Sequence, residues 1–253
     1  TSLVEAKLAG VYSVGLDINP FAVLACRVKT YNYDVDVLKK MWEQIKIRIY
    51  KYNDYYSNIM MEMLVLNIDK QIQEKINKET ESLVKDIEFS KWFSEDVLRQ
   101  LYIIKDTLLE LEYTREREFF DLAFFAIIRR VSYAYDAEVR PHVNKKKRKR
   151  DAIEAYVKKV NEMIETMDKW NLVTDSQVYS NAYIVSNADG QEVNAIIKHE
   201  RERSGKQLGA VLSHPPYLNC FDYIPVYKLK FLWADGFEEI FGKKTYKEIK
   251  DSE

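Results

Sequence analysis

The sequence predicts an α/β fold in which a short sheet is interrupted by a large helical insertion. Residues 11–17 form a mostly apolar run that ends in an acidic side chain, and Pro20 then opens an apolar segment, as in a buried strand followed by a helix. None of the seven glycines and five prolines lies between Thr30 and Arg140, which predicts long helices with short connections. Residues 209–213, a second short apolar run that stops at two prolines, predict another buried strand.

Composition sets limits on the class of protein. The chain has 253 residues, of which 47% are hydrophobic and 31% charged, with a formal net charge of −1. This is enough for a substantial core, but any nucleic-acid surface must be local. Cys26 and Cys220 have no metal-ligand spacing, and neither do His142 and His199. These features favour a reducing, cytoplasmic setting without a metal site, and no apolar run reaches the roughly 20 residues of a membrane helix.

The segment His214-Pro215-Pro216-Tyr217 directly follows the second apolar run. Two consecutive prolines fix two φ angles and remove two backbone donors, so the neighbouring carbonyl groups cannot be used by a continuing helix. These carbonyls and the tyrosine ring would lie at the carboxyl end of a strand, where open α/β sheets bind their ligands. A flat ring that carries an amino group would fit such a loop.

These four residues, with the continuation 218–223, resemble the catalytic loop of DNA methyltransferases that modify the exocyclic amino group of adenine or cytosine. In that family the loop is usually Asp, Asn or Ser, then Pro-Pro, then Tyr or Phe, whereas this chain has His214 first. The resemblance implies that His214 and the Pro215 carbonyl accept the two amino hydrogens, and that Tyr217 stacks on a base flipped out of the duplex. A neutral imidazole can accept one such bond in one tautomer. His214, Pro215, Pro216 and Tyr217 are therefore the predicted catalytic residues.

Two further segments resemble the part of this family that binds S-adenosylmethionine. Asp17-Ile18-Asn19-Pro20 implies that Asp17 holds the ribose diol and that Ile18 packs on the adenine ring, with Asn19 in the same binding segment. Residues 183–189 resemble a strand and loop whose acidic residue, Asp189, accepts the adenine amino group. An ordinary Asp-Gly turn at Asp189 explains that second segment about equally well.

The glycine-rich cofactor loop of the family is not found in the sequence. Residues 1–10 resemble the helix that follows the aromatic-x-Gly-x-Gly turn in these enzymes. We therefore expect an amino-terminally truncated fragment that is inactive alone and that needs the missing segment as a partner.

The resemblance also implies the domain organisation. We expect an incomplete Rossmann-like methyltransferase sheet, with residues 1–30 and 173–253 as the two catalytic parts and residues 31–172 as a helical insertion. In a permutation known for this family the region between the motifs reads the target sequence. A scaffold or a dimerisation arm is an equal alternative for the insertion.

One strong cationic run lies near the end of the insertion. It consists of Lys145, Lys146, Lys147, Arg148, Lys149 and Arg150. Contact with DNA phosphates would release counterions and make binding depend steeply on salt. The alternative is a solvated loop, which is the commoner fate of such runs.

Together these features predict methyl transfer from S-adenosylmethionine to DNA, with a restriction endonuclease as a further partner and no membrane association. Two alternatives remain open. One is an RNA methyltransferase that acts on an exocyclic amino group, and the other is a DNA-binding or assembly module without catalysis.

Overall fold

The structure is a computed structural model, which describes residues 1–53, 69–136, 138–185, 190–213 and 223–241. The chain divides into two compact units. We name them the sheet unit, residues 1–31 and 174–223, and the helical unit, residues 32–173 and 224–253. Among the described residues, none of the helices combines the length and apolar character that a membrane crossing requires.

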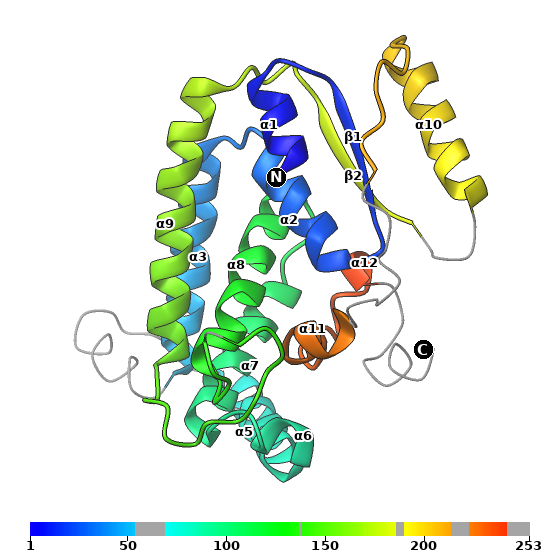
Figure 1. Cartoon of the computed structure of the whole chain (residues 1–253). Coiled ribbons are helices and arrows are strands. Elements are labelled where there is room, and N and C mark those ends of the chain that lie inside the picture. The colour runs from blue at the N-terminus through cyan, green and yellow to red at the C-terminus, as the bar shows by residue number, and fades with distance from the viewer. Residues whose placement is uncertain (54–68, 137, 186–189, 214–222, 242–253) are drawn as a thin grey trace. The chain divides into compact units, whose positions relative to one another are not determined.

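The sheet unit is built on two parallel strands, β1 (Ser13–Asp17) and β2 (Ser180–Ile184) (Figure 1). Their register pairs Ser13 with Ser180 and Asp17 with Ile184, so both strands end at the same edge. The prediction of a strand that ends in Asp17 is confirmed. The fold is thus a mixed α/β fold with a small parallel sheet.

Two helices cover one face of this sheet, α1 (Ser2–Leu8) and α2 (Pro20–Thr30). Leu3, Val23 and Ala182 form their shared core. Gly15 allows α1 to approach β1, because a Cβ atom at this position would lie 2.7 Å from Cδ1 of Leu3.

The helix α10 (Gly190–Ser204) covers the opposite face. Successive side chains of a strand point to opposite faces. Ala182 packs with α1 and α2, whereas its neighbours Asn181 and Tyr183 hydrogen-bond to Glu200 of α10. Helices on both faces of a parallel sheet are the usual arrangement of α/β proteins.

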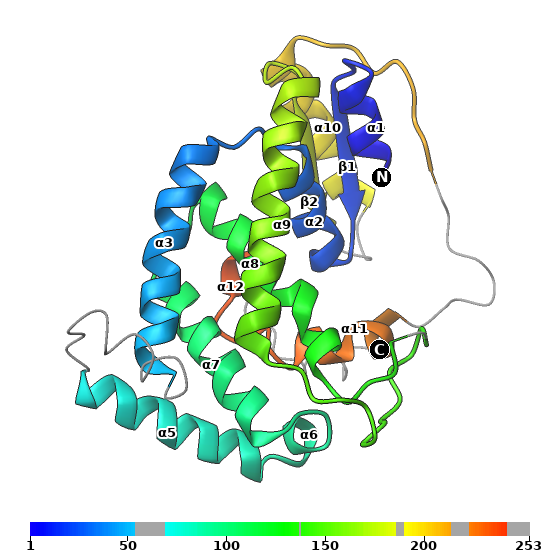
Figure 2. The same ribbon diagram turned by 90° about the vertical axis from the view of Figure 1, so that its left-hand side faces the viewer.

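The helical unit is formed by helices of very different length. Here α7 packs against α3, α5, α8 and α9, and Figure 2 shows this group from a second direction. The prediction of long helices is confirmed for most described residues of the insertion. The elements are α3 (Val35–Tyr52), α5 (Lys70–Lys85), α6 (Ile87–Ser90), α7 (Glu95–Leu109), α8 (Arg115–Val131), α9 (Ala152–Val173), α11 (Tyr223–Phe231) and α12 (Glu238–Phe241).

Aromatic side chains hold the core of the helical unit together. Trp42 of α3 stacks on Phe120 of α8, with ring centroids 6.2 Å apart, and meets Tyr156 of α9 edge-on at 5.6 Å. Such pairs contribute about 0.5–1.5 kcal/mol each beyond their buried area. One cluster therefore ties three helices together.

The segment after residue 223 packs with the helical unit. Trp233 is 1% exposed and lies edge-on to Phe93 and Phe124, at 5.9 and 6.1 Å. The helical unit therefore includes part of residues 173–253, the segment that the sequence predicted to be the second catalytic part. Which unit carries catalysis and which carries recognition stays a prediction.

The expected strand at residues 209–213 is not formed. Residues 205–213 have no regular secondary structure, and Val211 and Leu212 are 74% and 86% exposed. The prediction of a buried strand here is therefore wrong. A strand needs a neighbour for its backbone N–H and C=O groups, and in the described part of the chain no segment pairs with this one.

Candidate functional site

Asp17 lies at the carboxyl end of β1, in the turn that leads into α2. Its Oδ1 accepts a hydrogen bond from the backbone N–H of Asn19 at 2.8 Å. The residue is exposed. Since each carboxylate oxygen can accept more than one hydrogen bond, this fixed carboxylate can still bind a ligand that carries hydroxyl groups.

Ile18 and Asn19 complete the turn in different ways. Ile18 is 53% exposed and offers an apolar surface next to the carboxylate. Asn19 is the N-cap of α2, where its Oδ1 accepts from the backbone N–H of Phe21 at 3.0 Å. Pro20 follows at the first helical position, where its missing N–H costs nothing. The side chain of Asn19 therefore has a structural role in the helix start.

The end of β2 lies beside this turn. The backbone N–H of Val185 donates to the carbonyl of Asp17 at 3.1 Å, one residue beyond Ile184. The chain then enters residues 186–189, so the predicted cofactor residue Asp189 lies outside the described residues. The two strand ends thus form one edge, with Asp17 and Ile18 on it.

The predicted catalytic residues cannot be placed. His214, Pro215, Pro216 and Tyr217 all lie within residues 214–222, outside the described ranges. The structure therefore groups Asp17, Ile18 and Asn19 at one sheet edge.

A buried carboxylate, Glu200 on α10, was missed by the sequence analysis. It is 3% exposed and accepts hydrogen bonds from the hydroxyl groups of Tyr12 and Tyr183 and from the guanidinium of Arg203, at 2.9 Å for Nη2. Burial by itself would raise the pKa of Glu200, but these hydrogen bonds outweigh it and lower the pKa to about 2. Glu200 is therefore ionised at neutral pH and holds α10 on the sheet.

Tyr183 is one of the hydroxyl donors to Glu200, and its own pKa is shifted as well. Burial and the hydrogen bond to Glu200 raise the pKa of Tyr183 to about 12. Its hydroxyl therefore stays protonated and donates to the carboxylate. From the sequence, only the pairing of Glu200 with Arg203 three residues later could have been recognised. Tyr12 lies 188 residues away from Glu200 in the sequence.

The predicted DNA-binding run lies between α8 and α9, and its members differ in environment. The side chain of Lys147 is only 10% exposed and forms an ion pair with Asp136 at 2.8 Å, and Arg150 reaches the same carboxylate at 3.4 Å. Lys145 lies over the ring of Tyr133, with Nζ 4.9 Å from the centroid. Lys145 is exposed, as are Lys146, Arg148 and Lys149.

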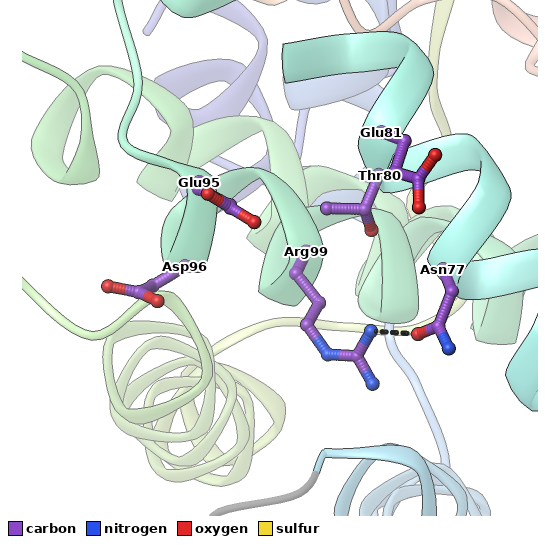
Figure 3. A pocket seen from close by; sticks show the side chains of 6 residues that line it. All are labelled: Asn77, Thr80, Glu81, Glu95, Asp96 and Arg99. Atoms are coloured by element: carbon purple, nitrogen blue, oxygen red, sulfur yellow. Dashed lines mark hydrogen bonds between the residues drawn. The ribbon is translucent and has the colours of Figure 1, made fainter.

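A pocket lies between α5 and α7 in the helical unit (Figure 3). Arg99 donates to Oδ1 of Asn77 at 2.6 Å across it, and the acidic side chains of Glu81, Glu95 and Asp96 also line it. None of the predicted site residues lies there. Within the described ranges, no group of three or more His, Cys, Asp or Glu side chains is arranged to hold a metal ion.

Comparison with known proteins gives one informative match. The chain is 30% identical over 128 residues to the type II methyltransferase M.MjaII of Methanocaldococcus jannaschii. The match covers 48% of this chain and 23% of that relative, so the chain spans less than a quarter of the relative's length. No protein-family model matches the chain, and no solved structure matches it.

Proposed function

We propose that this chain is part of an enzyme that transfers a methyl group from S-adenosylmethionine to the exocyclic amino group of adenine or cytosine in DNA. The observation that carries the proposal is the presence in one chain of Asp17-Ile18-Asn19-Pro20 and His214-Pro215-Pro216-Tyr217. The identity to a type II methyltransferase supports the class of reaction.

The turn after β1 fits the nucleoside part of the cofactor. Asp17 is an exposed carboxylate, which can accept hydrogen bonds from both hydroxyl groups of a ribose. Ile18 offers apolar contact to an adenine ring, and Asp189 would accept from the adenine amino group. When bound, S-adenosylmethionine supplies the methyl group that is transferred.

The proline loop would hold the base that receives the methyl group. His214, as a neutral imidazole, and the carbonyl of Pro215 accept the two hydrogens of the exocyclic amino group. These bonds favour the tetrahedral geometry that the nitrogen adopts as it reacts, so they strengthen in the transition state. Pro216 fixes its own φ angle and restricts the backbone of Pro215, and Tyr217 stacks on the flipped base, which is worth about 1–3 kcal/mol.

DNA is the proposed substrate, and the helical unit is the proposed target-recognition part. The long helical insertion and the continuation Leu218-Asn219-Cys220-Phe221-Asp222-Tyr223 resemble the DNA enzymes more than the RNA enzymes. Transfer of labelled methyl groups to RNA and not to DNA would favour the RNA alternative. DNA binding without cofactor binding would favour an assembly module.

Asp17→Asn tests the cofactor site directly. Asparagine keeps Oδ1 for the Asn19 N–H but removes the charge, so we expect S-adenosylmethionine to bind about 10- to 100-fold more weakly. Calorimetric titration of the complete protein encoded by the gene measures this change.

Asp175→Asn is the matched control. Asp175 is also exposed, and its Oδ1 accepts from the backbone N–H of Gln177 at 2.8 Å, the same local contact that Asp17 makes. It precedes β2 instead of following a strand. We expect its replacement to leave cofactor binding unchanged, and equal effects of the two substitutions would refute the assignment of Asp17.

A further inference from the structure

The loop between α8 and α9 (Figure 1) contains cationic side chains that donate hydrogen bonds to its own backbone carbonyls. Ala134 and Val143 form an antiparallel bridge, flanked by a hydrogen bond from Tyr135 N–H to the His142 carbonyl at 3.1 Å. The guanidinium of Arg129, at the end of α8, donates to the carbonyls of Tyr135 and Val139 at 2.9 and 3.0 Å. Arg129 therefore satisfies backbone acceptors that a short loop leaves without partners.

Lys147 also donates hydrogen bonds to backbone carbonyls of this loop. Its Nζ donates to the carbonyls of Ala134 at 2.8 Å and Arg129 at 3.3 Å, and to Oδ1 of Asp136 at 2.8 Å. Burial alone would raise the pKa of Asp136, but the hydrogen bond and charge of Lys147 and the charge of Arg150 lower it below its ordinary value. Lys147 and Arg150 are thus used within the fold.

Lys146, Arg148 and Lys149 differ from these cations. All three are exposed, and they lie next to a turn in which Oδ1 of Asn144 accepts from the Lys146 N–H at 3.0 Å. The contacts of the described residues join none of their side chains to an acidic group. The loop therefore presents these three cations on a braced backbone, next to Lys145, which is exposed but lies over the ring of Tyr133.

Among the described residues, the acidic groups near the loop contact partners other than Lys146, Arg148 and Lys149. Asp136 is paired with Lys147 and Arg150, and Glu138 contacts His142. Asp151 accepts hydrogen bonds from Gln100 at 2.7 Å and from its own helix. A local positive surface therefore persists on a chain whose net charge is −1.

We propose that Lys146, Arg148 and Lys149 contact the phosphates of duplex DNA, whereas Lys147 and Arg150 are positioning residues that brace the loop and do not bind DNA. The inference rests on the proposed function for its choice of DNA as the polyanion. Phosphate contacts fix the position of a protein on the duplex without reading its sequence. We therefore expect this contact to be independent of the target sequence.

The test is the salt dependence of binding to a short fluorescent DNA duplex, measured by anisotropy with the complete protein. Each neutralised phosphate contributes about 0.9 to the slope of log affinity against log salt. The triple variant Lys146→Ala, Arg148→Ala, Lys149→Ala should therefore lose about 2.7 of that slope. Between about 50 and 200 mM salt, the parent should lose roughly 40-fold more affinity than this variant.

The control removes three exposed lysines elsewhere in the helical unit, by Lys39→Ala, Lys40→Ala and Lys78→Ala. It changes the net charge equally, and we expect it to keep the parent slope. Equal slopes for the parent and the loop variant, or equal losses in the loop and control variants, would overturn the inference. So would a parent whose binding to the duplex does not depend on salt.

The substitution Lys147→Met tests whether Lys147 stabilises the loop, as distinct from binding DNA. It removes a cation that makes three internal contacts, so it should lower the thermal midpoint, whereas the exposed triple variant should not. An unchanged midpoint for Lys147→Met would refute the bracing role. Because none of these measurements requires the cofactor, a failure of methyl transfer is distinguishable from a failure of this surface.

Discussion

At the scale of single residues, Glu200 illustrates how the sheet unit balances a buried charge. Its carboxylate is 3% exposed, yet it is held by two tyrosine hydroxyls and by Arg203. A buried charge that lost these partners would be strongly destabilising. The position of α10 on the sheet therefore depends on one ionised group.

Glu200→Gln should lower stability at neutral pH and lose this effect in acid. The pKa of Glu200 is lowered from 4.5 to about 2 in the folded protein. Its stabilisation is therefore fully present above pH 4.5 and is lost as the pH falls towards 2. Urea unfolding of parent and variant measures the difference, which we expect to be on the order of 1–3 kcal/mol at neutral pH.

That difference should stay constant above about pH 4.5 and shrink as the pH falls from there towards 2. Glu202→Gln is the control, because Glu202 lies on the same helix and is exposed. A difference between parent and Glu200→Gln that does not shrink below pH 4.5 would contradict the role of the charge.

Asp17 and Glu200 also show how far the sequence predicts the candidate site. The side-chain hydrogen bonds of the turn at Asp17 are local, since Asp17 accepts from Asn19 and Asn19 accepts from Phe21, and the sequence predicts this turn. Of the partners of Glu200, only Arg203 is close in the sequence, whereas Tyr12 precedes β1 and Tyr183 lies on β2. No local pattern therefore predicts the whole cluster.

At the scale of elements, the sheet unit depends on the close approach of α1 to β1. Gly15→Ala should destabilise the protein by about 1–3 kcal/mol, because the new methyl group would clash with the buried side chain of Leu3. Urea unfolding measures this loss.

A double-mutant cycle with Leu3→Ala provides the control. In the Leu3→Ala background the added methyl group has space, so Gly15→Ala should cost clearly less there. Strictly additive effects would show that the contact between Leu3 and Gly15 does not limit the packing.

Elements also show where prediction from sequence fails. The strand β1 and the start of α2 follow from an apolar run, a cap and a proline. Residues 209–213 have the same apolar character but no strand beside them in the described part of the chain. A strand is a property of a pair of segments, so an apolar run alone does not determine one.

At the scale of the whole molecule, the chain consists of two compact units of different construction. Glycine and proline content predicted the helical character of residues 31–172. It did not predict that residues 224–241 join this unit, because an apolar segment does not reveal which core it enters. The contacts of Trp233 with Phe93 and Phe124 place this segment in the core of the helical unit.

The net charge of the whole chain likewise does not describe its local surface. The net charge of −1 hides a local cationic surface at Lys146, Arg148 and Lys149. We propose that the turn at Asp17 binds the cofactor, that the loop with Lys146, Arg148 and Lys149 binds phosphates, and that residues 214–217 hold the base that is methylated.

The most direct test of this account is transfer of labelled methyl groups from S-adenosylmethionine to duplex DNA by the complete protein, followed by nucleoside analysis. We predict N6-methyladenine or N4-methylcytosine as the product. We also predict that His214→Ala lowers the transfer rate much more than it lowers DNA affinity. A methyl group on a ring carbon, a substrate that is only RNA, or an undiminished rate for His214→Ala would contradict the account.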